Sequence, residues 1–270
     1  MLFLIMALVM LFVLVPFLFW RGTWFGRPLT DQQIGQYLAD AKQPRKTQHA
    51  LAQIAERLLR GDPSVRQWYP QVLALANHPL TELRVVTAWV MGHDNQSEEF
   101  HQSLLGLLED PEPMVRHNAA LSLVRFGDAR GRPELLSMLR SYWLRAGAAG
   151  TVRFRLKVAD AVNPGTLVAR IERGADDFFE VRSPLPGHLA AKLADDGDPV
   201  EVGDAILLLA PAAEQAWEAL RALYLVGQPE DLPDVDAIVV PFGNATICVC
   251  RPVAKLKNSM VGPAAESGLK

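Results

Sequence analysis

Two cysteines and a few histidines are the side chains with the most obvious potential for chemistry. Cys248 and Cys250 stand two residues apart in a strand-like segment, so both point to the same face. A zinc site would need two further ligands and usually spaces such a pair more widely, so we interpret both as ordinary thiols. His93, Asp94 and His101 could gather around one helix turn. Histidines in such a loop are more often solvated or capping groups, so the sequence predicts no metal site.

Acidic residues give no better candidate for catalysis. Asp176 and Asp177 are adjacent, and adjacent side chains on a hairpin point apart, so they do not form an acid/base pair. The chain has no glycine-rich phosphate loop, no nucleophile elbow and no H-E-x-x-H motif. We therefore expect no catalytic residues, no cofactor and no enzymatic activity.

The clearest pattern is a repeat of 32 residues that contains two arginines. The stretches 72–84 and 104–116 align so that Pro79 matches Pro111 and Arg84 matches Arg116. A proline-containing turn between two apolar helical patterns predicts an antiparallel helix pair in each repeat. One pair cannot bury its own apolar face, so several pairs must stack. A charge that recurs with the repeat is expected to serve the repeat, with ligand contact as the lesser alternative for both arginines.

Residues 108–128 closely resemble the HEAT repeat, and the resemblance covers about three repeats between Lys46 and Arg140. It implies that Arg84 and Arg116 bond neighbouring turns and acidic groups. It also implies that the helices bind partner proteins along a concave surface.

A second duplication follows, with an offset of 37 to 38 residues. Short alternating strand patterns and glycines at turns predict two copies of a β unit, arranged as a pseudo-twofold β-sandwich. The positions that match are Arg145 with Arg182, Gly150 with Gly187, Asp160 with Asp198, Gly165 with Gly203 and Ile171 with Leu209.

This duplicated region resembles the biotinyl/lipoyl domain, also called a barrel-sandwich hybrid. The first half departs from that pattern at Ala159, where the family often has glycine. Carriers of a swinging cofactor have a lysine in the hairpin between the halves, but Glu172 to Val181 contains none. Arginine cannot supply the amine that an amide link needs, so we expect no bound biotin or lipoate.

Phe178 and Phe179 are consecutive in that hairpin and should point to opposite faces of a strand. One ring is expected to fill the sandwich core. The other should either pack on the helical repeats or anchor a partner protein. Both phenylalanines, with Arg84 and Arg116, are the candidate interaction residues.

The first twenty residues suggest a membrane anchor. Leu2 to Trp20 lacks charged side chains, and a helix of that length spans about 28 Å, close to the hydrocarbon thickness of a bilayer. A cleaved signal peptide would need a basic start and small residues at its end. Arg21 and Arg27 follow the segment, which predicts an outside N-terminus and a cytoplasmic body.

Residues beyond the sandwich return to a helical pattern. Leu220 and Leu223 fall on one helix face, and 222–235 resembles a HEAT inner helix with its exit turn. The sandwich is therefore either inserted into the helical array or flanked by it. Residues 238–250 predict a strand, turn and strand. The last twenty residues lack aromatics and are expected to be disordered.

Composition fits a folded chain and excludes some partners. The 270 residues are 50% hydrophobic and 21% charged, which excludes wholesale disorder. With 27 basic and 30 acidic residues, nothing indicates nucleic-acid binding, and no small-molecule ligand is expected. Two cysteines cannot form a disulfide framework.

Together these patterns predict a multi-domain α + β protein: a transmembrane helix, an α-solenoid of about three HEAT-like repeats, then a small all-β barrel-sandwich hybrid. The expected segments are an anchor (1–21), a linker (22–45), helical repeats (46–144), the biotinyl/lipoyl-like domain (145–211), a further helix (212–235), a β-hairpin (236–250) and a tail (251–270). The expected function is a non-catalytic scaffold or accessory subunit that binds proteins of a bacterial inner-membrane complex. The alternative is a membrane-fusion-type adaptor of a transport or secretion system, although such adaptors commonly carry a longer hairpin between the two halves.

Overall fold

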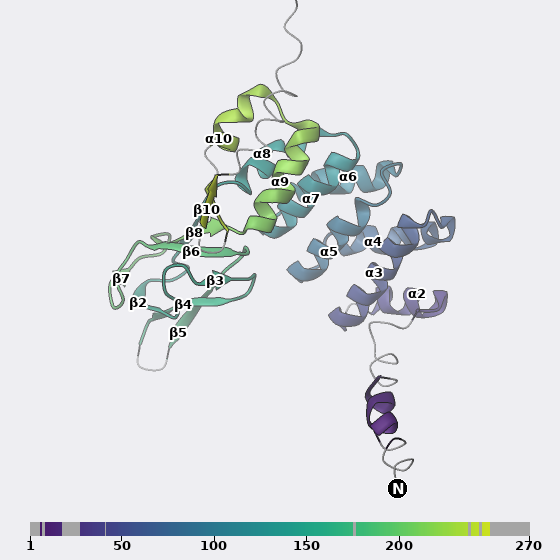
Figure 1. Ribbon diagram of the computed structural model, residues 1–270, viewed down its shortest axis with the longest axis horizontal. Helices are drawn as coiled ribbons and strands as arrows, with labels where there is room; N and C mark the ends of the chain where they lie inside the picture. Colours follow the sequence, from purple (N-terminus) through teal and green to yellow (C-terminus); the bar gives the residue numbers. More distant parts are fainter. Residues whose placement is uncertain are drawn as a thin grey trace, which may run out of the picture. The chain divides into compact units, whose positions relative to one another are not determined.

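The computed structural model describes residues 6, 9–17, 28–40, 42–174, 177–236, 239–242 and 245–248. The chain divides into two compact units, Met1–Val90 and Met91–Lys270, and each is described by itself. Figure 1 labels their helices and strands.

The first unit consists of helices whose ends follow from local sequence. Its elements are α2 (Asp31–Ala39), α3 (Pro44–Leu59), the 3-10 helix η1 (Pro63–Trp68), α4 (Tyr69–Leu75) and α5 (Thr81–Met91). Thr30 and Gln33 form a capping box at the start of α2, inside the stretch assigned to a linker. Gly61 adopts a φ of +72° after α3, a conformation that glycine accepts without strain. Ile34, Leu51 and Ile54 are fully buried and form part of the core.

The second unit begins with helices that continue the same pattern. They are α6 (Glu98–Leu107), α7 (Pro113–Arg125), the short η2 (Ala129–Gly131) and α8 (Arg132–Ser137). Pro113 lies in the first turn of α7, where the missing N–H costs nothing. Gly127 ends α7 with a φ of +71°, as Gly61 follows α3.

A β unit then interrupts the helices. Its strands are β1 (Tyr142–Arg145), β2 (Gly150–Phe154), β3 (Ala161–Val162), β4 (Leu167–Glu172), β5 (Phe178–Arg182), β6 (Gly187–Lys192), β7 (Pro199–Val200) and β8 (Ala205–Pro211). They form two four-stranded antiparallel sheets, with orders β1-β8-β6-β3 and β5-β4-β2-β7. Each strand of the first sheet has a counterpart four strands away along the chain: β5 for β1, β4 for β8, β2 for β6 and β7 for β3. With these counterparts, the two sheets have the same strand order. The strand order thus contains the duplication predicted from the 37–38-residue offset.

The core of the β unit lies between the two sheets. Val152, Val168 and Ile171 of one sheet and Leu189 and Ile206 of the other are almost fully buried. The barrel part of the predicted barrel-sandwich hybrid was wrong, because β1, β3, β5 and β7 each end a sheet instead of pairing with the other sheet. β3 and β7 are only two residues long, which is too short to close such a structure.

Helices resume after the β unit and pack on those before it. They are α9 (Ala213–Val226), η3 (Pro229–Asp231) and α10 (Leu232–Asp236). α9 contacts α7 and α8, and Leu220 and Leu223 share a buried cluster with Ala120 and Leu135. α9 therefore pairs with α8 as α7 pairs with α6. The β unit is inserted between the two helices of a pair, which is the first of the two arrangements that the sequence left open.

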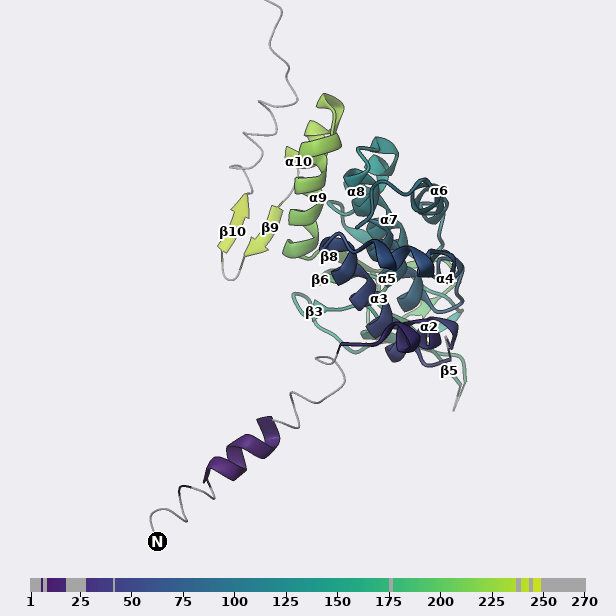
Figure 2. The ribbon, with the colours of Figure 1, turned by 90° about the vertical axis from the view of Figure 1, so that its right-hand side faces the viewer.

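The predicted terminal hairpin is present. β9 (Val239–Phe242) and β10 (Ala245–Cys248) pair antiparallel, and β9 lies against α9 (Figure 2). Cys250 and the predicted tail 251–270 lie outside the described residues.

The membrane anchor was also a wrong expectation, and the inner-membrane location with its topology rested on it. Among the residues that the structure describes, no helix is both long and apolar enough to cross a bilayer. Much of the predicted anchor from Leu2 to Trp20 lies outside the described residues.

Candidate interaction site

The two repeated arginines have matching positions in their turns. The Nη1 of Arg84 donates to the carbonyl oxygens of His78 at 2.9 Å and Pro79 at 3.3 Å. The Nη1 of Arg116 donates to the carbonyls of Asp110 at 2.8 Å and Pro111 at 3.2 Å, the same positions 32 residues later.

Arg116 also contacts a carboxylate of the next helix. Its Nε lies 3.2 Å from a carboxylate oxygen of Glu134 on α8, and the Arg116 side chain is only 25% exposed. These bonds favour the structural interpretation of both arginines over a role in ligand contact.

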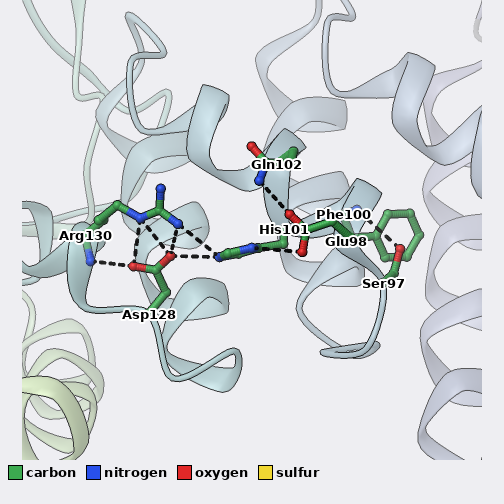
Figure 3. Close-up of polar contacts among 7 residues, drawn as sticks. All are labelled: Ser97, Glu98, Phe100, His101, Gln102, Asp128 and Arg130. Atoms are coloured by element: carbon green, nitrogen blue, oxygen red, sulfur yellow. Dashed lines mark hydrogen bonds and ion pairs between the residues drawn. The ribbon is translucent and has the colours of Figure 1, made fainter.

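A polar network links α6 to the turn after α7, and Figure 3 shows Asp128 between the side chains of His101 and Arg130. The Nε2 of His101 lies 2.7 Å from a carboxylate oxygen of Asp128. The backbone N–H and the Nε of Arg130 both donate to that carboxylate. On the other side of the ring, Nδ1 of His101 lies 3.6 Å from Glu98. The His101 ring stacks on Phe126, with centroids 5.0 Å apart.

This network positions a turn and is a poor candidate for acid/base catalysis. Hydrogen bonds from Arg130, aided by one from His101, hold the pKa of the Asp128 carboxyl well below its usual range. Asp128 therefore stays ionised, and both nitrogens of His101 face carboxylates. Ser97 is the nearby hydroxyl, and its oxygen accepts the Phe100 N–H at the start of α6. The sequence offered one signal for Asp128: it follows Gly127 as Asp62 follows Gly61, and both aspartates accept an N–H two residues on.

The other candidates from the sequence are separated from one another. His93 contacts Arg125, with Nδ1 and Nη1 2.7 Å apart, rather than joining His101. Burial, with a smaller effect of the Arg125 charge, lowers the pKa of His93 to about 4. Asp177 pairs with Arg173 at 2.7 Å, and Asp176 lies outside the described residues. Within the described part of the chain, no three histidine, cysteine or acidic side chains are placed to hold a metal.

A buried histidine that the sequence analysis did not single out lies where the β unit leaves and rejoins the helices. His117 on α7 is 3% exposed. Its Nδ1 accepts from Gln215 of α9 at 2.9 Å, so its Nε2 carries the hydrogen and donates to the Ser137 hydroxyl of α8 at 3.0 Å. Burial first, and the Arg116 charge second, lower the pKa of His117 to about 4. Neutral His117 thus joins three helices.

The first unit contains an open groove of about 810 Å³ between α3 and α5. Gln53 and Arg57 of α3 line one side together with Arg60, which follows α3, and Trp89 of α5 lines the other. Trp89 is 40% exposed. An aromatic surface beside guanidinium groups is the composition of a protein-binding surface.

The hairpin between the halves of the β unit exposes both phenylalanines. Phe178 is 47% and Phe179 is 39% exposed, so the expectation that one fills the core was wrong. The rings lie at the start of β5, beyond the buried cluster. Phe178 stacks under the guanidinium of Arg170 at 4.5 Å from the ring centroid. Phe179 lies against Gly147, where an added Cβ would fall 2.6 Å from the ring.

Comparisons with known proteins identify the helical part. The family model of HEAT repeats matches residues 69–152, which confirms the HEAT-repeat prediction for the helices from α4 to α8; the match then runs on into β1 and the start of β2. No curated protein matches the chain. Among solved structures, a single-chain, multi-domain long-chain acyl-CoA carboxylase is similar at 18% identity and a TM-score of 0.25. The match covers 47% of this chain and 14% of that chain, so this chain spans a small part of that protein's length.

Proposed function

We propose that this protein is a non-catalytic scaffold that binds partner proteins through its helical repeats and through the hairpin of its β unit. The observation that carries the proposal is the HEAT-repeat match over residues 69–152, because stacked helix pairs of this kind offer extended binding surfaces. The groove beside Trp89 supplies one surface, and the exposed Phe178 and Phe179 supply another.

The polar clusters support a binding role over a catalytic one. Arg84 and Arg116 bond turn carbonyls, and Asp128 and His101 bond each other. Each of these groups stabilises a repeat, so none is positioned to act on a substrate. We expect no enzymatic turnover by this chain.

We further infer that the β unit is related to biotinyl/lipoyl domains but carries no cofactor. The relationship is supported by the two sheets, in which equivalent strands of the two halves follow one another in the same order. The β4–β5 hairpin occupies the position between the halves, and its residues from Glu172 to Val181 include no lysine. The intact mass of the purified chain should therefore equal the 29.8 kDa of the unmodified sequence.

The scaffold role is tested by quantitative mass spectrometry of proteins that copurify with the tagged full chain. Trp89→Ala should deplete at least one partner tenfold or more. Trp217→Ala is the matched control, because this tryptophan of α9 is similarly exposed, at 46%, but lies outside the groove. The groove is rejected if both variants retain the same proteins. Phe178→Ser and Phe179→Ser test the hairpin in the same way, after equal melting temperatures establish that each variant is folded.

A further inference from the structure

β5 is an edge strand of the second sheet, and one side of its backbone is available for pairing. β5 is the first strand in the order β5-β4-β2-β7, so among the described strands it has a neighbour on one side only (Figure 1). At the hairpin, the Arg173 N–H donates to the Asp177 carbonyl at 2.8 Å. Hydrogen-bonded pairs alternate along an antiparallel ladder, so the next ones are Ile171 with Phe179 and Ala169 with Val181. The N–H and C=O groups of Phe178 and Glu180 therefore point to the open edge.

Side chains along this edge are held in position by their own contacts. Arg170 stacks on Phe178 and donates to Glu180 at 3.2 Å, and Arg182 also bonds Glu180. Phe179 lies against Gly147. Fixed aromatic rings that remain half-exposed lose little freedom when a partner covers them.

The other sheet margins are less suited to pairing. β3 and β7 have two residues each, and β7 begins with Pro199, which lacks an N–H. The β1 ladder shifts register at Arg145. Short strands, prolines and irregular pairing are devices that prevent edge-to-edge association. β5 has five residues with neither proline nor lysine. The register shift in its ladder, between Leu167 and Ala169, lies away from Phe178 to Glu180, so this part of the edge lacks these protections.

We propose that the partner at this edge is the β5 strand of a second copy of the chain, which pairs antiparallel about a two-fold axis at Phe179. Phe178 of each copy then exchanges both backbone hydrogen bonds with Glu180 of the other. This inference rests on the proposed interaction role of the hairpin and names its partner.

Two features favour a second copy as the occupant. A two-fold axis presents the same edge twice, so every outward N–H meets an outward C=O. The axis also places Phe179 opposite its own copy, and cross-strand aromatic pairs are stabilising. In this register the Glu180 carboxylate of one copy lies beside the Phe178–Arg170 stack of the other, which matches opposite charges across the interface.

The first test is sedimentation equilibrium of the full chain over a range of concentrations. Glu180→Pro removes an N–H that the β4–β5 ladder does not use, and edge strands tolerate proline. Glu180→Ala is the matched control, since it loses the same carboxylate and keeps the N–H. The parent chain and Glu180→Ala should dimerise, and Glu180→Pro should dimerise at least tenfold more weakly than Glu180→Ala, with the same melting temperature as that control. A monomeric parent chain, or equal dimerisation of the two variants, overturns the proposal.

The second test reads the position of the axis. Under oxidised glutathione, Phe179→Cys should cross-link to its own copy, since residue 179 faces itself. Glu180→Cys should cross-link no more than the parent chain, because it faces Phe178. Equal cross-linking by the two variants overturns this register. If Glu180→Pro instead removes a different copurifying protein from a monomeric chain, self-pairing is overturned while the proposed scaffold function stands.

Discussion

The helical repeats and the β unit are both built from duplicated sequence, but they use their repeated arginines in opposite ways. In the helical part, Arg84 and Arg116 each bond carbonyls of their own repeat. In the β unit, Arg145 donates to the Gly203 carbonyl and Arg182 to the Gly165 carbonyl, both at 2.8 Å, so each arginine bonds the other half.

Backbone hydrogen bonds in the β unit also run from each half to the other. The N–H of Val152 donates to the carbonyl of Asp198, and the N–H of Leu189 to that of Asp160, both at 3.0 Å. Repeats related by translation pair most of their hydrogen-bonding groups within the repeat. Such an array therefore tolerates added or lost repeats. Halves related by a pseudo-twofold axis pair hydrogen-bonding groups with each other. Neither half is therefore expected to fold without the other.

The largest expected effect comes from a glycine in the closely packed β unit. A Cβ at Gly187 would lie 2.2 Å from the Ala210 carbonyl oxygen, and backbone cannot move aside as a side chain can. Gly187→Ala should cost about 3 kcal/mol or more. Gly127→Ala in the helical part adds its Cβ to open space at a φ of +71° and should cost about 1 kcal/mol. Urea denaturation measures both, and equal losses would contradict the comparison.

A second prediction concerns the helices that flank the β unit. The pKa of His117 is about 4, whereas an unfolded histidine titrates near 6.5. Between those values the unfolded chain binds a proton that the folded chain excludes, so stability falls as pH falls. The loss should reach about 3 kcal/mol, since a tenfold change in protonation equilibrium is about 1.4 kcal/mol. His93, whose pKa is also about 4, adds to the same pH dependence. His117→Gln should therefore reduce, and not abolish, the difference in unfolding free energy between pH 7 and pH 4.5, and an unchanged difference would contradict the prediction.

The repeat register of the helical part is tested by two arginines. Arg116→Ala should cost about 1.5–3 kcal/mol, because its charged hydrogen bonds are partly buried. Arg125 is exposed and contacts His93, so Arg125→Ala should cost about 0.5 kcal/mol or less. Equal melting temperatures for the two variants would contradict the prediction that the turn arginine contributes more to stability than the surface arginine.

The smallest expected effect tests whether the two equivalent turns of the β unit have the same backbone conformation. Ala159 has a φ of +75° at the position that Gly197, with +101°, occupies in the other half. Ala159→Gly should stabilise the protein by about 1 kcal/mol by relieving left-handed strain, and Gly197→Ala should destabilise it by a similar amount. Both changes are read by thermal denaturation, and stabilisation by Gly197→Ala would show that the two turns are not equivalent.

The sequence predicted the features that depend on neighbours along the chain. The 32-residue spacing placed Arg84 and Arg116 in equivalent turns because each turn repeats the same local bonds. The departure at Ala159 was visible because one turn requires the same conformation in both halves.

Features that depend on distant residues were not predictable in the same way. The pairing of α8 with α9 was left open because the two helices are separated by the whole β unit. Phe178 and Phe179 alternate as a strand requires, but alternation alone does not say where the core ends. The first twenty residues were judged on apolarity alone, and among the described residues no helix is both long and apolar enough to cross a bilayer.

The insertion of the β unit has a consequence for the order in which the chain assembles during synthesis. Ribosomes add roughly 5–20 residues per second, so α9 emerges about 4–15 s after α8. Until then Leu135 of α8 lacks the cover that Leu223 provides. The first and last strands of the insert pair with each other, at Tyr142 and Leu209, so closing the β unit returns the chain to the place it left. The α8–α9 pair can therefore be completed only after the whole β unit has been synthesised, which makes it a late step of folding during translation.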